Sequence, residues 1–419
     1  MNHSQYKLFS FHQLILNIKD TLIIFAKEFG SVFNDRGVVI LFFVASILYP
    51  ALYCSLYRNE TLVDVPIAVV DGSRSLRSTE LLRHVDATRD VKIVSTYATI
   101  DEAKKAFDNR EVHGLIYIPA DFNKKLSNGE QATISTYSDM SSFMYYRAMM
   151  MATNYSILDM GKQIQVERLN AQGFTGESAT VISNPIPYEA VILYNEGAGF
   201  ASFLMPAILI LIIHQTLFFG IGMIAGTSRE ENRFHELVSS KVHRGGTFKV
   251  VIGKSACYFL IYGLLSVYIL GFIPHAFNLP HIGNPVDLMI LMVPFLLATI
   301  FFSMTVSVFL PNRETGLIIF MFFSLILLFL SGISWPRSNI SGFWQAFSWI
   351  FPSTHGIQGY VKINTMGANI HTISLEYLSL WGQTAVYFLT ATWAYRWQIK
   401  KSSKKYQKES KEETELITK

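Results

Sequence analysis

Two short stretches of the sequence contain residue types that enzymes use for catalysis. Gly253-Lys254-Ser255 has the order that ends a phosphate-binding P-loop, but that motif needs another glycine where this chain has Phe248. His235-Glu236 has the order that begins the metal-binding helix of zinc metalloproteases, but the position of the second ligand is Ser239. The sequence therefore predicts no catalytic centre, cofactor or metal in this chain, and any energy for work on a substrate must come from another chain.

A polar pair and a pair of glycines stand out within the apolar run 197–228. His214 and Gln215 lie midway along it, where polar side chains are costly and face a cavity or another helix by default. They could line a pathway through the protein or form a helix–helix hydrogen bond, and the sequence leaves both interpretations open. Gly222 and Gly226 are spaced as a small-xxx-small pair, which lets helices approach closely.

The composition indicates a membrane protein. Charged residues make up 16% of the 419 residues, and Phe alone occurs 32 times. A typical soluble domain has about 25% charged residues, so an ordinary cytosolic enzyme is excluded, as is a disordered or fibrous protein. The net charge of +4 is too small to indicate a nucleic-acid partner. The two cysteines, Cys54 and Cys257, lie in apolar runs and exclude a disulfide framework or a cysteine-rich metal site.

Six apolar runs are long enough to cross a bilayer, whose hydrocarbon core of about 30 Å requires roughly 20 helical residues. These predicted transmembrane helices are 38–57, 197–228, 255–274, 288–310, 315–332 and 377–395. The predicted fold is an α-helical integral membrane protein with six transmembrane helices and an inserted α/β extracytoplasmic domain. The predicted domains are an N-terminus at 1–37, the first helix at 38–57, the inserted domain at 58–195, the remaining helices at 197–395 and a basic tail at 396–419.

The distribution of Lys and Arg predicts the orientation of the chain. The N-terminal 37 residues carry four of them, the segment 229–249 carries five and the tail carries eight. The turn 275–285 carries none, and the loop 334–376 carries two. Because cytoplasmic loops are enriched in Lys and Arg, both termini are predicted to be cytoplasmic and the domain 58–195 to be outside.

The large loop after the first apolar run alternates strand-like and helix-like segments. The predicted strands are 65–70, 91–97, 114–118 and 132–137. The predicted helices are 75–85, 100–109, a helix opened by Pro119 and a long helix at 141–170. This alternation is typical of a mixed α/β domain, and about 140 residues are enough for a core of its own.

A helix with one apolar side is predicted next to the first transmembrane helix. Its apolar positions have helical spacing and are Phe11, Leu14, Ile15, Ile18, Leu22, Phe25 and Phe29. Such a helix is expected to lie in the membrane interface, although a packed soluble helix would show the same pattern. The lysine-rich tail is expected to be attracted to anionic lipid.

Two more segments have unusual composition. The connection 227–249 is long, charged and helix-like for a link between two transmembrane helices, so it is expected to contact a partner; the alternative is a solvated loop. The segment 334–366 lies outside and is rich in aromatic residues. Because aromatic side chains favour the membrane interface, it is predicted to be a re-entrant segment of short helices in the outer leaflet, with Trp335, Pro336, Pro352 and His355 as its marked residues.

Four stretches carry a resemblance to a known family. They are 65–71 (VPIAVVD), 114–122 (GLIYIPADF), 227–237 (TSREENRFHEL), and 332–367 with Trp335-Pro336 and the run 351–355. In this order they resemble permease subunits of ABC-2 type exporters, especially the bacterial drug-efflux-like permeases with a large periplasmic domain after the first transmembrane helix. The resemblance covers nearly the whole chain.

The resemblance implies how the protein would work. Two permeases would pair as a homodimer or heterodimer in the bacterial inner membrane, and each would bind a separate cytoplasmic ATPase that holds ATP and Mg²⁺. The external domain would meet a periplasmic adaptor, and the substrate would be hydrophobic or amphipathic. Phe234 and Leu237 would insert into a groove of the ATPase, beside charged contacts. The coupling residues would be Arg229, Glu230, Glu231, Arg233, Phe234, Glu236 and Leu237.

Two other functions would be compatible with a membrane-spanning chain. A membrane-embedded enzyme would need clustered acids, His or Ser at the bilayer surface, and the sequence shows no such set. A membrane receptor or phage-entry-type protein could share the external domain without an ATPase partner. Such a protein does not need a long charged segment at 227–249, so the export function is favoured.

Overall fold

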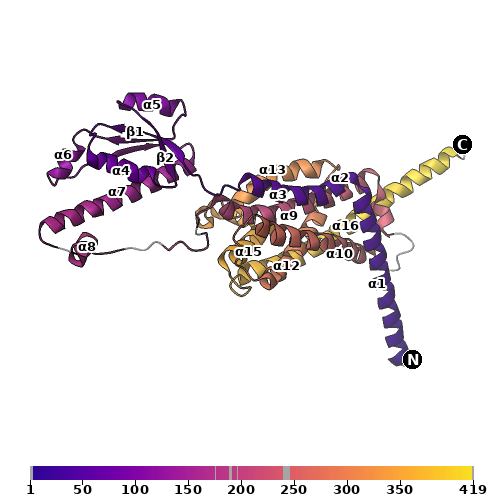
Figure 1. The fold of residues 1–419 in the computed structure, drawn as a ribbon. Helices are drawn as coiled ribbons and strands as arrows, with labels where there is room; N and C mark the ends of the chain where they lie inside the picture. Colours follow the sequence, from indigo (N-terminus) through magenta and orange to yellow (C-terminus); the bar gives the residue numbers. More distant parts are fainter. Residues whose placement is uncertain (1–2, 175, 188–190, 196, 239–245, 418–419) are drawn as a thin grey trace. The chain divides into compact units, whose positions relative to one another are not determined.

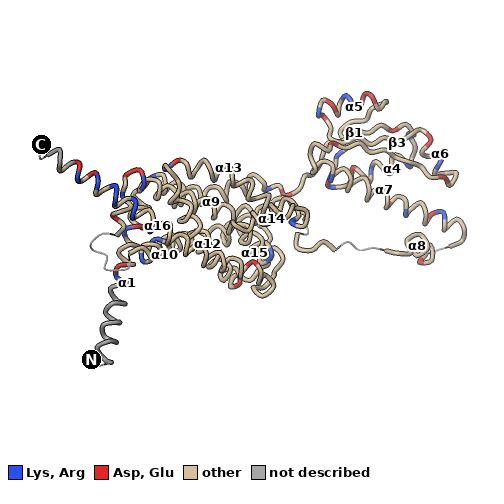
Figure 2. The backbone as a smooth tube through the Cα atoms, turned by 180° about the vertical axis from the view of Figure 1, so that it is seen from behind, with Lys and Arg blue, Asp and Glu red and all other residues tan. Residues whose placement is uncertain are grey.

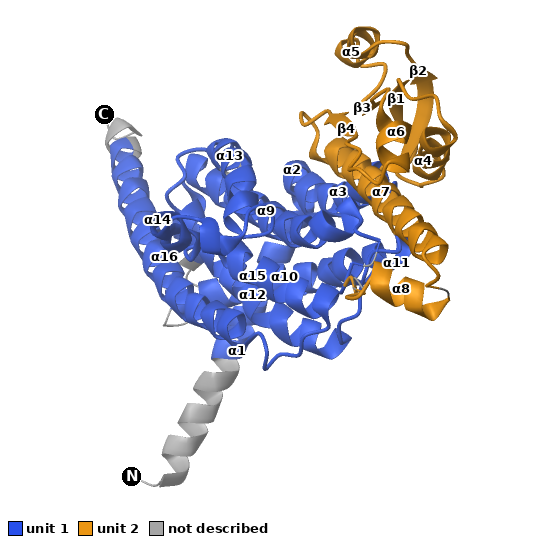
Figure 3. Ribbon diagram, turned by 90° about the vertical axis from the view of Figure 1, so that its left-hand side faces the viewer, with its two compact units in different colours: residues 1–60, 193–419 blue, residues 61–192 orange. Residues whose placement is uncertain are grey.

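The computed structural model describes residues 3–417 except 175, 188–190, 196 and 239–245. Side chains before residue 17 also lie outside this description, and among them are the predicted apolar positions Phe11, Leu14 and Ile15. Ser239 lies in the omitted range 239–245. The chain divides into two compact units (Figures 1 and 3). Unit 1 contains residues 1–60 and 193–419, and unit 2 contains residues 61–192.

Unit 2 is built on a four-stranded mixed sheet. Strand β1 (Val65–Asp71) pairs in parallel with β2 (Val91–Thr96) and with β3 (Gly114–Ile118), and β4 (Ser135–Ser138) is antiparallel to β3. The strand order is β2-β1-β3-β4. The helices are α4 (Leu76–Asp86), α5 (Ile100–Asp108), α6 (Phe122–Ser127), α7 (Phe143–Ala171) and α8 (Glu177–Ser183). All eight predicted strands and helices of this region are present, with ends that differ by at most three residues.

The alternation of side chains along β1 explains how the sheet is covered. Val65, Ile67 and Val69 belong to one buried cluster with residues of α4 and α7. Ala68 and Val70 point to the opposite face and belong to a second cluster with residues of α5. Successive residues of a strand face opposite sides, so a strand buried on both faces is apolar throughout.

Unit 1 is a bundle of helices (Figure 1). Its elements before unit 2 are α1 (His3–Asn34), α2 (Arg36–Val39), η1 (Ile40–Ala45) and α3 (Ser46–Leu56). The next are α9 (Phe200–Glu230), η2 (Arg233–Val238), α10 (Gly246–Val267), η3 (Tyr268–Phe272), α11 (Ile273–Ala276) and α12 (Pro285–Ser307). The last are α13 (Thr315–Leu330), η4 (Arg337–Asn339), α14 (Gly342–Ser348), α15 (Pro352–Met366) and α16 (Ser374–Ile417).

Four helical stretches of the described chain are long and apolar enough to cross a membrane. They are Arg36–Leu56, Phe200–Glu230, Gly246–Ala276 and Pro285–Ser307, and they correspond to the first four predicted transmembrane helices. The fifth, α13, is apolar but has only 16 residues, or about 24 Å at 1.5 Å per residue. The sixth lies within the 44-residue helix α16, which is not among the four. The described chain thus has four candidate membrane spans, and the count of six stays a prediction.

Helix α9 lies at the centre of unit 1. Of its apolar window, 83% is buried, and α3, α12, α13 and α15 pack against it. Gly220 permits one of these contacts, because a Cβ atom there would lie 1.7 Å from the ring of Phe42. Figure 2 shows that the charged residues of unit 1 gather toward the ends of the bundle and leave its middle almost free of charge.

Candidate functional site

The predicted coupling segment begins where α9 ends. The helix stops at Glu230, and Asn232 then has a positive φ of 54°. This backbone conformation ends a right-handed helix and is more readily adopted by Asn than by most residues. The short 3-10 helix η2 follows at Arg233–Val238, and residues 239–245 lie outside the described part of the chain.

Three charged side chains of this segment are exposed and form one cluster. Arg233 pairs with Glu231 at 2.5 Å and with Glu236 at 3.6 Å, and all three side chains are about half exposed. Exposed ion pairs contribute little to stability, so the fold does not need this cluster. Glu231, Arg233 and Glu236, called here the coupling cluster, are therefore available to a partner.

Phe234 is placed differently from the expectation that it inserts into a partner. Its side chain is only 1% exposed, and its ring contacts the ring of Tyr395 in α16 with centroids 5.9 Å apart. The neighbouring backbone is held to the same helix, since the N–H of His235 donates to Ser402 Oγ at 3.1 Å. In this structure Phe234 anchors η2 to α16, and Leu237 is half-buried. The sequence does not show that α16 covers Phe234, and the contact of this residue with an ATPase stays a prediction.

Arg229 and Glu230 hold the end of α9 to the loop 308–314. One guanidinium nitrogen of Arg229 donates to the carbonyls of Val308 and Leu310 at 2.6 and 2.8 Å. These carbonyls follow the end of α12, where backbone acceptors lack helical partners. Glu230 accepts a hydrogen bond from the backbone N–H of Arg313 at 2.9 Å. Both side chains therefore have roles inside the protein.

Asp35 and Arg313 form an ion pair beside this loop. The two terminal nitrogens of Arg313 contact the two carboxylate oxygens of Asp35 at 2.6 and 2.5 Å. Asp35 also caps α2, because its Oδ1 accepts from the N–H groups of Gly37 and Val38. Burial raises the pKa of Asp35, but the hydrogen bonds from Arg313 and Val38 and the charge of Arg313 outweigh it, so the pKa is below its usual value.

The lowered pKa of Asp35 predicts a pH-dependent stability. The ionised Asp35 contributes to the free energy of unfolding. This contribution is fully present above the pKa of about 3.9 that an aspartate has in the unfolded chain, and it is lost as the pH falls through the lower pKa of the folded state. Arg313 faces this carboxylate, and Glu230 and Glu231 lie near Arg313. We expect Asp35→Asn to lower the melting temperature at pH 7, although the amide oxygen of Asn can still accept the hydrogen bonds of the cap. Below pH 4 the melting temperatures of the variant and the wild type should differ less. A difference independent of pH, measured by thermal unfolding in nanodiscs, would contradict this.

Two buried ion pairs fasten α1 to α10. Lys249 Nζ lies 2.7 Å from Asp20, and Lys254 Nζ lies 2.6 Å from Glu28. The hydroxyl of Tyr258 also donates to Glu28. All four ion-pair side chains are at most 8% exposed. The apolar periodicity of α1 does not indicate these pairs; the signal in the sequence is the two lysines, Lys249 and Lys254, close to the start of an apolar run.

The opposite side of α1 is apolar and exposed. Ile18, Leu22 and Phe33 are between 48% and 60% exposed, and Phe29 is 39% exposed. A soluble helix would pack these side chains and expose its acids, whereas α1 does the reverse. This arrangement favours a helix that lies in the membrane interface.

A cavity of about 300 Å³ lies between α1, α9, η2 and α10. Its polar lining comes from Lys27, Glu28, Ser31, Ser228, Arg233, Glu236 and Lys254. Ile23, Ile24, Ile224 and Leu237 supply the apolar part. The cavity thus adjoins the coupling cluster and can receive a side chain that has both polar and apolar parts.

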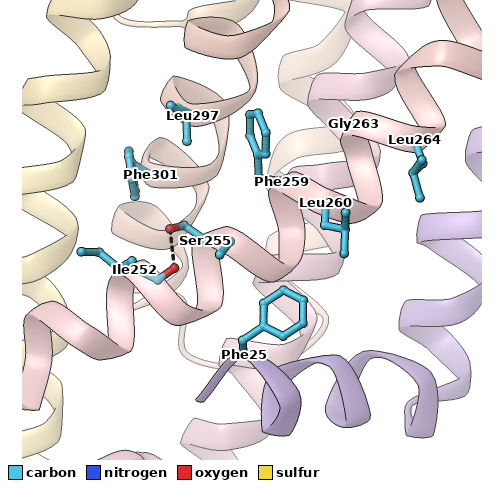
Figure 4. A pocket seen from close by; sticks show the side chains of 10 residues that line it. Phe25, Ile252, Ser255, Phe259, Leu260, Gly263, Leu264, Leu297 and Phe301 are labelled. Carbon is cyan, nitrogen blue, oxygen red and sulfur yellow. Dashed lines mark hydrogen bonds between the residues drawn. The ribbon is translucent and has the colours of Figure 1, made fainter. Parts of the chain in front are cut away.

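A larger cavity, of about 710 Å³, is apolar (Figure 4). It is bounded by Phe25 of α1, Phe259 of α10 and Phe301 of α12, with other apolar residues between them. Ser255 is the polar side chain in its lining, and its hydroxyl donates to the carbonyl of Ile252 at 3.0 Å. Such a lining suits hydrocarbon or aromatic groups.

The predicted pathway residues lie on different sides of α9. His214 is buried, and its ring stacks on Phe302 of α12 with centroids 5.9 Å apart. Gln215 is half-buried. Adjacent residues on a helix do not face the same side, so the pair does not act as one unit. Whether either residue lines a pathway stays a prediction.

The segment 334–366 forms the short helices η4, α14 and α15. Trp335 is 57% exposed and Pro336 is exposed, whereas Pro352 and His355 are buried. The ring of His355 contacts Trp349 edge-on with centroids 5.0 Å apart. Helix α15 packs against α9, α12 and α16, so this part of the segment belongs to the bundle.

Comparison with known proteins identifies the family. Residues 36–393 match the family described as ABC-2 family transporter protein. The chain belongs to this family. Over 373 residues it is 22% identical to a protein named "Probable multidrug ABC transporter permease YbhR" in Escherichia coli strain K12 and in E. coli O157:H7. The alignment covers 88% of this chain and 95% of each relative.

Membership of the ABC-2 family agrees with the chemistry of the described residues. The protein is a membrane-embedded, multi-pass transporter permease and not an enzyme by family. Within the described residues, no group of three or more His, Cys, Asp or Glu side chains could hold a metal ion. Permeases of ABC transporters in general act with an ATPase and dimerise.

Proposed function

We propose that this chain is the transmembrane permease of an ATP-driven exporter in a bacterial inner membrane. A separate cytoplasmic ATPase would bind the coupling cluster and, by hydrolysing ATP, would change the shape of the permease. Both termini would be cytoplasmic, and unit 2 would be periplasmic, where an adaptor protein could bind it. A second permease, identical or different, would complete the transporter.

The exposure of the coupling cluster beside the 300 Å³ cavity carries this proposal. Glu231, Arg233 and Glu236 are exposed although their pairing does little for stability. Glu236 and Arg233 also line the cavity that α1 closes on its other side. A partner that contacts the cluster could place one side chain in the cavity and thereby contact both η2 and α1.

The apolar cavity supports a hydrophobic or amphipathic substrate. Phe25, Phe259 and Phe301 bound a space of about 710 Å³ next to α1 (Figure 4). If α1 lies in the membrane interface, as its exposed apolar side favours, this space would be reached from the bilayer. A membrane-dissolved substrate could then enter without crossing water.

Reversing two charges of the coupling cluster tests the ATPase interaction. We expect Glu231→Lys together with Glu236→Lys to reduce co-purification of the ABC ATPase by at least about ten-fold, because the two changes reverse the net negative charge of the cluster and so destroy its electrostatic complementarity to the partner. The amount and melting temperature of the permease should not change, since the cluster is exposed. Co-purification from membranes with quantitative mass spectrometry measures this.

Helix α16 offers a matched control. Glu409 and Glu412 are exposed and pair with Lys405 and Lys408 at 3.7 and 3.6 Å, so their reversal changes the same charge outside the cluster. ATPase recovery should be normal with this variant. Equal ATPase recovery with both variants would refute the role of the coupling cluster, and no ATPase with wild type would favour the receptor or phage-entry-type function.

A further inference from the structure

Arg313 joins three segments that are far apart in the sequence. Its guanidinium contacts both carboxylate oxygens of Asp35, at the start of the first transmembrane helix. The same side chain donates to Thr227 Oγ1 at 2.9 Å, and its backbone N–H donates to Glu230, both near the end of α9. Arg313 itself lies two residues before α13 begins at Thr315. We call the set Asp35, Thr227, Glu230 and Arg313 the arginine clasp.

Two glycines make room for the clasp. A Cβ atom on Gly226 would lie 2.6 Å from the Cα atom of Arg313, which is backbone and cannot turn aside. A Cβ atom on Gly37 would lie 2.6 Å from a guanidinium nitrogen of the same residue. The spacing of Gly222 and Gly226 suggested a close contact between helices. At Gly226 the close contact is instead with the loop 308–314.

The clasp is directly connected to the coupling cluster. Glu230 precedes Glu231 in the chain, and Arg229 holds the carbonyls of Val308 and Leu310 in the same loop. A displacement of η2 would therefore act on the loop 308–314 through side chains on consecutive residues. An arginine that pairs with a carboxylate through two parallel hydrogen bonds has a fixed orientation, so it can transmit such a displacement.

Helix α13 follows this loop and exposes much of its apolar surface. Met321, Phe322 and Leu325 are between 60% and 69% exposed, in contrast to α12, whose window is 67% buried. Few buried contacts therefore oppose a movement of α13, and the loop before it determines where the helix begins.

We propose that Asp35 and Arg313 are positioning residues that transmit movement of the coupling segment to the first transmembrane helix and to α13. This inference rests on the proposed function, because an ATPase must move the segment. The inference goes further than the proposed function, because an ATPase could bind the coupling cluster even if the ion pair between Asp35 and Arg313 transmitted no movement.

The test places an environment-sensitive fluorophore on α13 and requires no knowledge of the substrate. Cys54 and Cys257 are replaced by alanine and Met321 by cysteine, which is labelled in the complex of permease and ATPase in nanodiscs. Trapping the ATPase with ATP and vanadate should shift the fluorescence. We expect Asp35→Asn and Arg313→Gln to change the trapped equilibrium by roughly two- to thirty-fold without reducing ATPase binding.

Three further variants separate transmission from loss of structure. Arg313→Lys keeps the charge but not the paired hydrogen bonds, so its effect should be intermediate. The double variant Asp35→Asn with Arg313→Gln should be no worse than either single variant if the two residues act as a pair. Lys405→Met removes an exposed pair with Glu409 and should leave the fluorescence shift unchanged.

The outcomes distinguish the clasp from the proposed function. If the ATPase binds and the wild-type label responds, but the clasp variants respond equally, the clasp inference is overturned and the proposed function stands. If the wild-type label does not respond although the ATPase binds, transmission to α13 is also refuted. If no ATPase binds the wild-type permease, the proposed function fails and the clasp inference fails with it.

Discussion

Replacing Lys254 by methionine is expected to lower the free energy of unfolding by about 3–5 kcal/mol, because it leaves a buried carboxylate without its counter-ion. Lys254 and Glu28 are each 4% exposed, and their charged atoms are 2.6 Å apart. In the variant, Glu28 would keep the hydrogen bond from the hydroxyl of Tyr258 but would lose the charged partner Lys254. Thermal unfolding of the purified permease in nanodiscs measures the change.

Two controls show whether the loss comes from the unpaired charge. Adding Glu28→Gln to Lys254→Met removes the charge and keeps an acceptor for Tyr258, so it should recover a large part of the stability. Lys405→Met breaks an exposed pair and should cost less than about 1 kcal/mol. If the double variant is less stable than Lys254→Met alone, burial of the charge is not the cause.

Replacing Phe234 by alanine is the second change with a large expected effect. A fully buried phenylalanine replaced by alanine costs about 3–5 kcal/mol, because apolar contacts are lost and a cavity remains. Phe234 is 1% exposed and packs against Tyr395, so the melting temperature should fall. Below that temperature the ATPase should still bind, since the coupling cluster is unchanged.

The variant Phe234→Ala and the charge-reversal variant of the coupling cluster should have opposite effects on melting temperature and ATPase binding. Glu231→Lys with Glu236→Lys should lose the ATPase and keep its melting temperature, whereas Phe234→Ala should do the opposite. A Phe234→Ala variant that melts normally but no longer binds the ATPase would mean that Phe234 contacts the partner directly. That result would restore the role which the sequence suggested for this residue.

The elements of unit 2 could be predicted because local signals agree with the packing. Strand β1 is apolar on both faces, and Asp71-Gly72 marks its end. Helix α5 begins after the cap Thr99 and has acids in its first turn. Such signals act within a few residues, so they do not depend on the arrangement of the whole chain.

The candidate site could be predicted only in part, because the burial of residues at the end of α9 and in η2 depends on segments that are distant in the sequence. The sequence predicts a coupling segment at 227–249, but it does not show that α16 buries Phe234 or that the loop 308–314 engages Arg229 and Glu230. In the sequence, Arg313 is a single positive charge between the fourth and fifth predicted transmembrane helices. Its contact with Asp35 joins residues 278 positions apart, which no local pattern shows.

Helix α1 shows the same dependence on distant segments, whereas the sixth predicted transmembrane helix differs from the four candidate spans in its composition. The periodicity of α1 gave its apolar side correctly, but not that Asp20 and Glu28 are buried against α10. The window 377–395 contains many aromatic and hydroxyl residues and also Gln383, so its apolar character is weaker than that of the four candidate spans.

ATP hydrolysis by the reconstituted parts tests most directly the claim that this permease is moved by nucleotide used in another protein. The permease alone, the ABC ATPase that co-purifies with it, and the complex of the two are each assayed in nanodiscs. We expect no hydrolysis by the permease alone and a higher rate in the complex than for the ATPase alone, with the increase lost in Glu231→Lys with Glu236→Lys. Hydrolysis by the purified permease alone, or a rate that the permease does not change, would contradict the account.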